Sequence, residues 1–200
     1  MQRTLIVLFA GGAMFAAPCV AAAPGGDVSE TATIAKCEGC HGPGGNSTSR
    51  SVPRLNGQNA AYIASRLKAF LDPASQTPGA THAMWDISNQ IRPEEIDKIA
   101  QYFSGQTPTA AGETGKTTVA GRRIYMDGVG TAIPACRSCH GAQGQGSGVT
   151  PRLAGQHADY LSFQLQSFNL RTRYHSGMAN NTKAMSLDQI EAVSKFLGRD

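Results

Sequence analysis

Two short clusters of cysteine and histidine share one spacing along the chain. Each has two cysteines separated by two residues and a histidine directly after the second, at Cys37, Cys40 and His41 and at Cys136, Cys139 and His140. This C-x-x-C-H pattern is typical of covalent c-type haem attachment, with the histidine as an axial iron ligand. One copy would also fit a redox-active thiol pair or half of a zinc site. Two copies, each followed by a glycine-rich stretch, favour two covalently bound haem c groups.

A second protein ligand would complete the coordination of each iron. Met84 lies 18 residues before Tyr102, and Met178 lies 18 residues before Phe196. This equal placement predicts that Met84 and Met178 are the sixth ligands. A soft thioether ligand raises the reduction potential. It also keeps the coordination shell filled in both oxidation states, which favours electron transfer over the binding of small molecules.

Other histidines and methionines are alternatives for this position. His82 and His175 precede the two methionines at unequal offsets of two and three residues, so we interpret them as loop residues. Met185 starts the closing segment of the second half and Met126 lies on a preceding helical segment, so both are expected in the core. His157 follows a repeated Gly-Gln pair where the first half has asparagine, and no ligand role is expected for it.

The residues around each predicted haem supply polar partners. A ligating histidine usually donates its second ring N–H to a carbonyl or carboxylate. Pro53 and Pro151 follow the two motifs at similar distances, and we expect their carbonyls to be the acceptors, although both prolines could simply shape a turn. Arg54 and Arg152 come next, and the sequence leaves open whether they pair with a haem propionate or are solvated.

The chain is an internal duplication. Residues 53–58 recur as 151–156 with only one substitution, and a tyrosine follows each copy at the same distance. A repeat of this length indicates a duplicated domain, and a Gly/Thr/Pro-rich stretch between the copies reads as a linker. The sequence therefore predicts a first domain, a linker and a second domain at residues 24–106, 107–118 and 119–200.

Both halves have the periodicity of helices. Apolar residues after each repeated turn are spaced three and four apart, as one buried helix face requires. Pro93 suits the first position of a closing helix, while Ser186 and Gln189 form a capping-box pattern in the second half. Ser29 is expected to cap the first helix. Because no alternating strand pattern competes, the sequence predicts an all-α fold.

The first residues have the features of an export signal. Arg3 precedes an apolar run, and small residues end the segment, so residues 1–23 are predicted to be a cleavable signal peptide. The run is too short to span a bilayer, and we expect no transmembrane segment in the mature chain. The alternative is a lipid anchor at Cys19, the one cysteine of five that lies outside the two motifs. Export agrees with haem attachment, which in bacteria occurs outside the cytoplasmic membrane.

Charge is unevenly distributed between the halves. Residues 109–200 contain 10 basic and 6 acidic residues, against 7 and 8 in residues 24–108. This imbalance predicts that the second half faces an acidic partner. The basic residues are scattered and lack interleaved aromatic residues, so the sequence does not predict nucleic-acid binding.

On these residues the chain resembles the cytochrome c4 family of dihaem electron carriers. The resemblance covers residues 27–200 and rests on the paired attachment motifs, the paired Pro-x-Leu-x-Gly-Gln-x-x-x-Tyr turns and the paired late methionines. It implies two tandem class-I cytochrome c domains related by approximate two-fold symmetry. It also implies a periplasmic location and His41–Met84 and His140–Met178 ligand pairs. Trp85, directly after the first methionine, is a departure from the family pattern.

The resemblance implies single-electron transfer in a respiratory chain, with a membrane-bound reductase or terminal oxidase as redox partner. A dihaem peroxidase is one alternative, but it needs an open or displaceable sixth position, against which the matched methionines argue. A dihaem subunit of a flavoprotein or quinoprotein dehydrogenase complex is another. The sequence leaves that second alternative open.

Overall fold

The structure is a computed structural model that describes residues 28–72, 82–111, 116–173 and 175–199. The predicted signal peptide and Cys19 lie outside these residues, so both stay predictions.

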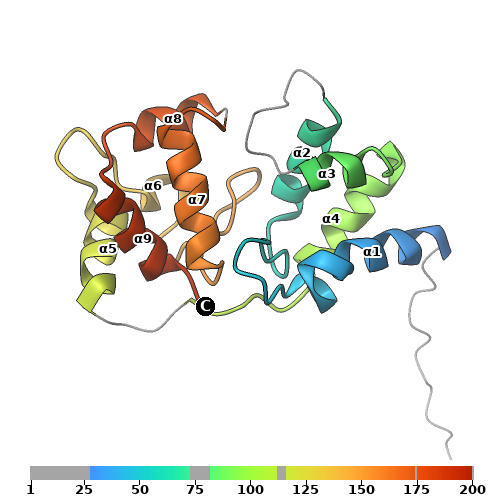
Figure 1. Cartoon of the computed structure of the whole chain (residues 1–200). Helices are drawn as coiled ribbons and strands as arrows, with labels where there is room; N and C mark the ends of the chain where they lie inside the picture. The colour runs from blue at the N-terminus through green and yellow to red at the C-terminus, as the bar shows by residue number, and fades with distance from the viewer. Residues whose placement is uncertain (1–27, 73–81, 112–115, 174, 200) are drawn as a thin grey trace, which may run out of the picture.

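Figure 1 shows two helical units joined by an extended segment. The first contains α1 (Val28–His41), α2 (Ala60–Leu71), α3 (His82–Ser88) and α4 (Ile96–Ser104), with 3-10 turns at Pro43–Gly45 and Pro93–Glu95. The second contains α5 (Lys116–Asp127), α6 (Arg137–His140), α7 (Ala158–Asn169), α8 (Ser176–Thr182) and α9 (Leu187–Leu197). Within the described ranges, β pairing is limited to the isolated bridges Val129–Ile133 and Ser147–Thr150, which agrees with the predicted all-α fold.

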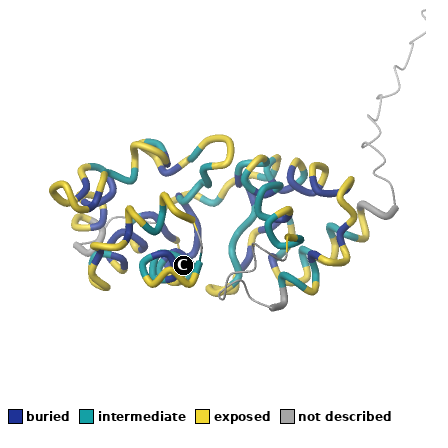
Figure 2. The backbone as a smooth tube through the Cα atoms, turned by 90° about the horizontal axis from the view of Figure 1, so that it is seen from above, coloured by how far each residue is buried: buried dark blue, intermediate teal, exposed yellow. Residues whose placement is uncertain are grey.

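Each unit has its own apolar core, and Figure 2 shows buried residues within both units. In the first, α2 packs against α4, and the core residues are Ile63, Leu67, Ile91, Ile96, Ile99, Ala100 and Phe103. In the second, α9 packs against both α5 and α7, and the core includes Ile124, Tyr125, Leu161, Met185, Ile190, Val193 and Leu197. Separate cores are what a duplicated domain requires.

The predicted helix starts are confirmed in two of three cases. The Ser186 hydroxyl accepts from Gln189 N at 3.2 Å, and the Gln189 side chain accepts from Ser186 N at 2.9 Å, which completes the capping box of α9. Pro93 occupies the first position of the 3-10 turn that leads into α4. The Ser29 prediction is wrong, because α1 already includes Ser29 and a cap residue must stand outside the helical residues.

The described part of the segment between the units makes contacts with both of them. The Asn56 side-chain amide donates to Thr107 O at 2.8 Å and to Thr109 Oγ1 at 3.1 Å. An ideal Cβ on Gly155 would lie 2.0 Å from Thr109 O, so the segment lies tightly against the second unit as well. Helix α5 begins at Lys116, inside the stretch assigned to the linker from sequence, while residues 112–115 lie outside the described residues.

A single glycine sets the close approach of α5 to α9. An ideal Cβ on Gly121 would lie 2.0 Å from Ala192 O and 2.8 Å from Phe196 Cβ. Gly121→Ala is therefore expected to force the helices apart and to lower the unfolding free energy of the second unit by about 1–3 kcal/mol, the usual cost of overpacking. Denaturant unfolding of the holoprotein measures the change. Gly105→Ala is the control, because its nearest neighbouring atom would lie 3.4 Å away, and equal stability losses in both variants would contradict the expectation.

Candidate haem sites

The two attachment motifs lie at the ends of helices. Cys37, Cys40 and His41 occupy the C-terminal end of α1, whereas Cys136 precedes the single turn of α6 that contains Cys139 and His140. Cys37 and Cys136 are half-buried and pack against the first and second cores, while Cys40 and Cys139 are exposed. Each motif therefore presents one thiol beside a core and one nearer the surface.

The glycine after each histidine ends the helix. Gly42 and Gly141 have φ angles of 78° and 80°, a region that residues with a Cβ rarely adopt. An ideal Cβ would lie 2.6 Å from Asn46 O at Gly42 and 2.4 Å from the Gln145 side chain at Gly141. This turn directs the chain away from the motif and towards the repeated Pro-Arg-Leu segment.

Both motif histidines are buried and oriented by a proline carbonyl. His41 Nδ1 lies 2.8 Å from Pro53 O, and His140 Nδ1 lies 3.0 Å from Pro151 O, which confirms the predicted acceptors. A carbonyl can only accept, so Nδ1 carries the proton and the neutral ring presents the lone pair of Nε2. Burial lowers the pKa of both histidines, and each proline hydrogen bond offsets part of that shift. The rings are therefore neutral and ready to bind a metal at neutral pH.

The more buried cysteine of each motif, Cys37 or Cys136, does not have the environment of a reactive thiol. Burial raises the pKa of the Cys37 thiol to about 11 and also raises that of Cys136, whereas reactive cysteines have lowered values. No disulfide joins any of the four motif cysteines. Across the described part of the chain, no three His, Cys, Asp or Glu side chains gather as a metal site, and structural zinc needs four protein ligands.

Both arginines of the repeated turn are half-buried. Arg54 Nη1 donates to Gly155 O at 2.8 Å and to Arg199 O at 2.5 Å, so it lies between the units. Arg152 Nε is buried and has no hydrogen-bond partner within the described residues. Buried donors rarely lack an acceptor, and a haem propionate is an acceptor of the required charge. The residues present therefore fit a haem in the second unit.

Both candidate methionines are half-buried and lie on short helices that the sequence did not predict. Met84 on α3 packs against the first core, as Cys37 does. Met178 lies on α8, which His175 precedes.

The other histidines and methionines considered as sixth ligands make contacts of a different kind. His175 lies in the loop before α8, as predicted, and its Nδ1 accepts from Met178 N at 3.2 Å, so it caps that helix. Met185 is only 8% exposed and belongs to the second core, as predicted. Met126 packs against the same core. His157 Nε2 lies 3.0 Å from Ser47 O, a contact between the units. The His82 side chain lies outside the described residues.

The chain matches known proteins over both units. A family model for cytochrome c matches residues 118–199. Cytochrome c4 of Thiocapsa roseopersicina is 34% identical over 80% of this chain and 85% of its own length. The chain belongs to the cytochrome c4 family. Cytochrome c-552 of Acidithiobacillus ferridurans is 36% identical over 80% of this chain and 72% of its own length.

Solved structures support this membership. The cytochrome c4 structure from Acidithiobacillus ferrooxidans matches with a TM-score of 0.76 and 34% identity, over 82% of this chain and 98% of that one. This match confirms the predicted fold, which consists of two tandem class-I cytochrome c domains. A thiosulfate dehydrogenase electron acceptor from Thiomonas intermedia is 30% identical over 98% of this chain and 90% of its own length.

As a cytochrome c4, this protein is a dihaem electron-transfer protein with two covalently bound haem c groups. Each bound haem supplies a one-electron iron couple. The protein supplies the surroundings: buried neutral histidines held by Pro53 and Pro151, apolar cores beside the motif cysteines, and a buried Arg152 Nε that could donate to a propionate. No helix in the described ranges is long and apolar enough to cross a membrane.

Proposed function

We propose that this cytochrome c4 is an electron carrier without substrate turnover, in which each unit holds one haem. Thioether bonds form at Cys37, Cys40, Cys136 and Cys139, and the axial pairs are His41 with Met84 and His140 with Met178. The observation that supports this most directly is the matched pair of buried histidines, each with Nδ1 held by a proline carbonyl. This arrangement leaves Nε2 of both rings as the metal-binding atom and repeats without change in the two units.

The proposed ligands suit rapid electron exchange. A histidine and a thioether fill both axial positions, so little has to rearrange when the iron changes oxidation state. The Met thioether favours the reduced iron and raises the potential. A filled shell also argues against peroxidase chemistry, which needs an open position.

We place the carrier in the periplasm, after removal of residues 1–23, with a membrane-bound reductase as donor and a terminal oxidase as acceptor. The test is reduction of the purified holoprotein by quinol-reductase membranes and its reoxidation by a purified terminal oxidase. We expect both haems to be reduced and reoxidised in this assay. Failure of the oxidase to reoxidise either haem would contradict a terminal oxidase as the electron acceptor.

The second candidate is a permanent subunit of a dehydrogenase complex. Similarity along 98% of this chain to a thiosulfate dehydrogenase electron acceptor favours it. Purification from the native organism distinguishes the two: a free carrier elutes as one polypeptide, whereas a stoichiometric flavoprotein, quinoprotein or haem-containing companion would establish the complex.

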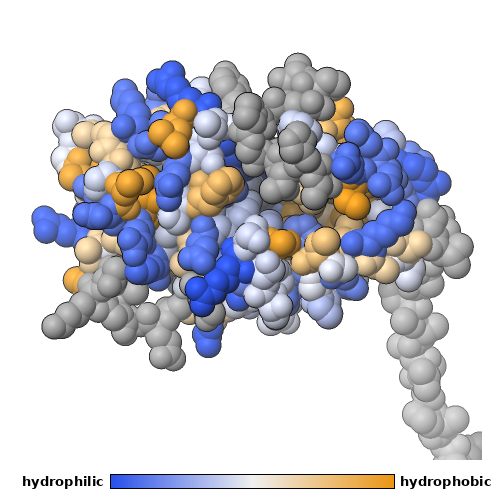
Figure 3. Space-filling model, in the orientation of Figure 1, coloured by the Kyte–Doolittle hydropathy of each residue, from blue (hydrophilic) through white to orange (hydrophobic). Residues whose placement is uncertain are grey.

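The surface suits a transient, charge-steered partner. On the face drawn in Figure 3, apolar patches are separated by hydrophilic side chains, and short-lived redox complexes have small interfaces whose rates depend on charge. Arg171 and Lys183 are exposed, and the segments that contain them are adjacent, because Asn169 Nδ2 donates to Thr182 O at 2.7 Å. Arg173 is unsuitable for docking, since it donates to Tyr62 OH at 3.2 Å across the two units.

Reversing both exposed charges, in Arg171→Glu with Lys183→Glu, is expected to slow electron transfer to an acidic oxidase about tenfold at low salt. The loss should shrink near physiological salt, where the screening length is about 8 Å. Stopped-flow oxidation across a range of ionic strength measures it. Arg122→Glu on α5 is the control, because Figure 1 places α5 and α8 apart within the unit. Equal slowing by the control, or a rate independent of salt, would contradict this docking surface.

A further inference from the structure

We propose that Gln58 and Gln156 are positioning residues, each of which tunes the axial histidine of the opposite unit through one shared peptide group. The inference rests on the proposed ligand roles of His41 and His140. It gives the repeated Gly-Gln turn a function in electron transfer as well as in packing.

In the first unit, one peptide group has partners on both sides. Its carbonyl oxygen, Pro53 O, accepts from His41 Nδ1 at 2.8 Å. Its N–H, at Arg54, donates to Gln156 Oε1 of the second unit at 2.8 Å. The Gln156 amide returns a bond from Nε2 to Arg54 O at 3.0 Å. A single rigid amide plane thus joins the histidine of one unit to the glutamine of the other.

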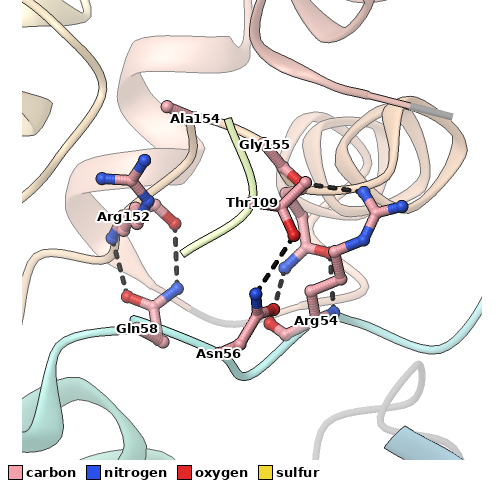
Figure 4. A pocket seen from close by; sticks show the side chains of 8 residues that line it. Arg54, Asn56, Gln58, Thr109, Arg152, Ala154 and Gly155 are labelled. Atoms are coloured by element: carbon pink, nitrogen blue, oxygen red, sulfur yellow. Dashed lines mark hydrogen bonds between the residues drawn. The ribbon is translucent and has the colours of Figure 1, made fainter. Parts of the chain in front are cut away.

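The second unit repeats this arrangement in reverse. Pro151 O accepts from His140 Nδ1 at 3.0 Å, and the N–H of the same peptide, at Arg152, donates to Gln58 Oε1 at 2.7 Å. Gln58 Nε2 donates to Arg152 O at 2.9 Å, and Figure 4 shows both bonds between these residues. The two relays are related by the approximate two-fold symmetry of the units.

Both glutamine side chains are fixed in one orientation. Each is only 7% exposed. Gln58 Oε1 also accepts from Asn59 N at 2.9 Å, and Gln156 Oε1 accepts from His157 N at 3.0 Å. Two N–H donors face each oxygen and a carbonyl faces each nitrogen, so a flipped amide would lose all of these bonds. The N–H of each shared peptide therefore donates to one fixed glutamine oxygen that is shielded from water.

The consequence follows from polarisation along a hydrogen-bond chain. A peptide whose N–H donates has more negative charge on its carbonyl oxygen, so that oxygen accepts more strongly. A stronger bond to Nδ1–H makes the imidazole a more basic ligand. A more basic ligand stabilises the ferric iron and lowers its potential. Each unit, by docking, thus lowers the potential of the haem in the other.

The test is a pair of substitutions that remove the acceptor and keep the side-chain length. Gln156→Met should raise the midpoint potential of the first unit's haem, and Gln58→Met that of the second unit's haem. We expect the ferric-to-ferrous ratio at fixed potential to fall about threefold to tenfold, where tenfold corresponds to about 59 mV for one electron. NMR-monitored redox titration measures each haem separately through its methyl signals. Gln156→Asn and Gln58→Asn, which shorten the amide, should produce the same crossed shifts if a methionine variant fails to fold.

Asn59→Ala is the matched control. Asn59 Nδ2 donates to Thr150 O across the interface at 2.7 Å, but it touches neither shared peptide, so both potentials should be unchanged. A shift confined to the unit that contains the substituted glutamine, equal shifts of both haems, or no shift would overturn the relay. Ligation is checked independently in the unsubstituted protein by the hyperfine-shifted ring protons of His41 and His140. Their presence together with absent crossed shifts refutes the relay alone, and their absence refutes the ligand assignment and the relay with it.

Discussion

Replacing Cys37 and Cys40 by serine is expected to remove the haem of the first unit completely and to leave that of the second in place. Serine oxygen does not add to the porphyrin vinyl groups under the conditions of haem attachment. The first unit has fewer than a hundred residues, and units of this size usually need a covalent or metal staple to fold. Loss of its porphyrin should therefore unfold α1–α4, while the separate core of the second unit persists.

Intact mass after acid–acetone extraction measures this result. The unsubstituted mature chain should carry two haem increments and the double serine variant one, with about half of the far-ultraviolet helical signal lost. The mirror variant, Cys136→Ser with Cys139→Ser, is the matched control and should lose the other haem. A mature chain without haem mass would refute covalent attachment, and loss of both haems in either variant would refute independent units.

Met84→Ala and Met178→Ala are each expected to remove about half of the weak far-red absorption of oxidised protein that arises from sulfur bound to iron. Alanine cannot coordinate, so the iron of that unit should become high-spin or bind an added ligand such as cyanide or imidazole more tightly. Its potential should fall, because the soft thioether favours the reduced iron. Visible spectroscopy and redox titration measure both changes.

Two substitutions serve as controls for the methionine prediction. Met185→Ala should keep the full far-red band although it removes a core side chain, at a cost of about 2–5 kcal/mol in unfolding free energy. His175→Ala should also keep the band and lose only the cap of α8, worth about 1 kcal/mol. Loss of the band in His175→Ala, with the band intact in Met178→Ala, would reverse the ligand assignment in the second unit.

The local features of both haem sites could be predicted from sequence because they depend on neighbours along the chain. Two thiols and a histidine at fixed spacing define an attachment site wherever the segment folds. The proline carbonyl acceptors followed from similar offsets, 12 and 11 residues after the two histidines, and were confirmed at 2.8 and 3.0 Å. The helix faces and the Ser186 capping box were confirmed for the same reason, since they depend on residues three and four apart.

The contacts between units depended on tertiary structure. The sequence did not predict the contacts of Gln58 and Gln156 across the units, and it left open whether Arg54 is solvated. Their partners lie about a hundred residues away along the chain, and periodicity contains no information at that range. The α3 and α8 helices were missed because they are seven residues each, too short for a helical period to be visible. The sequence thus determined what each haem site contains, and only the packing of the two units decided which groups the sites share.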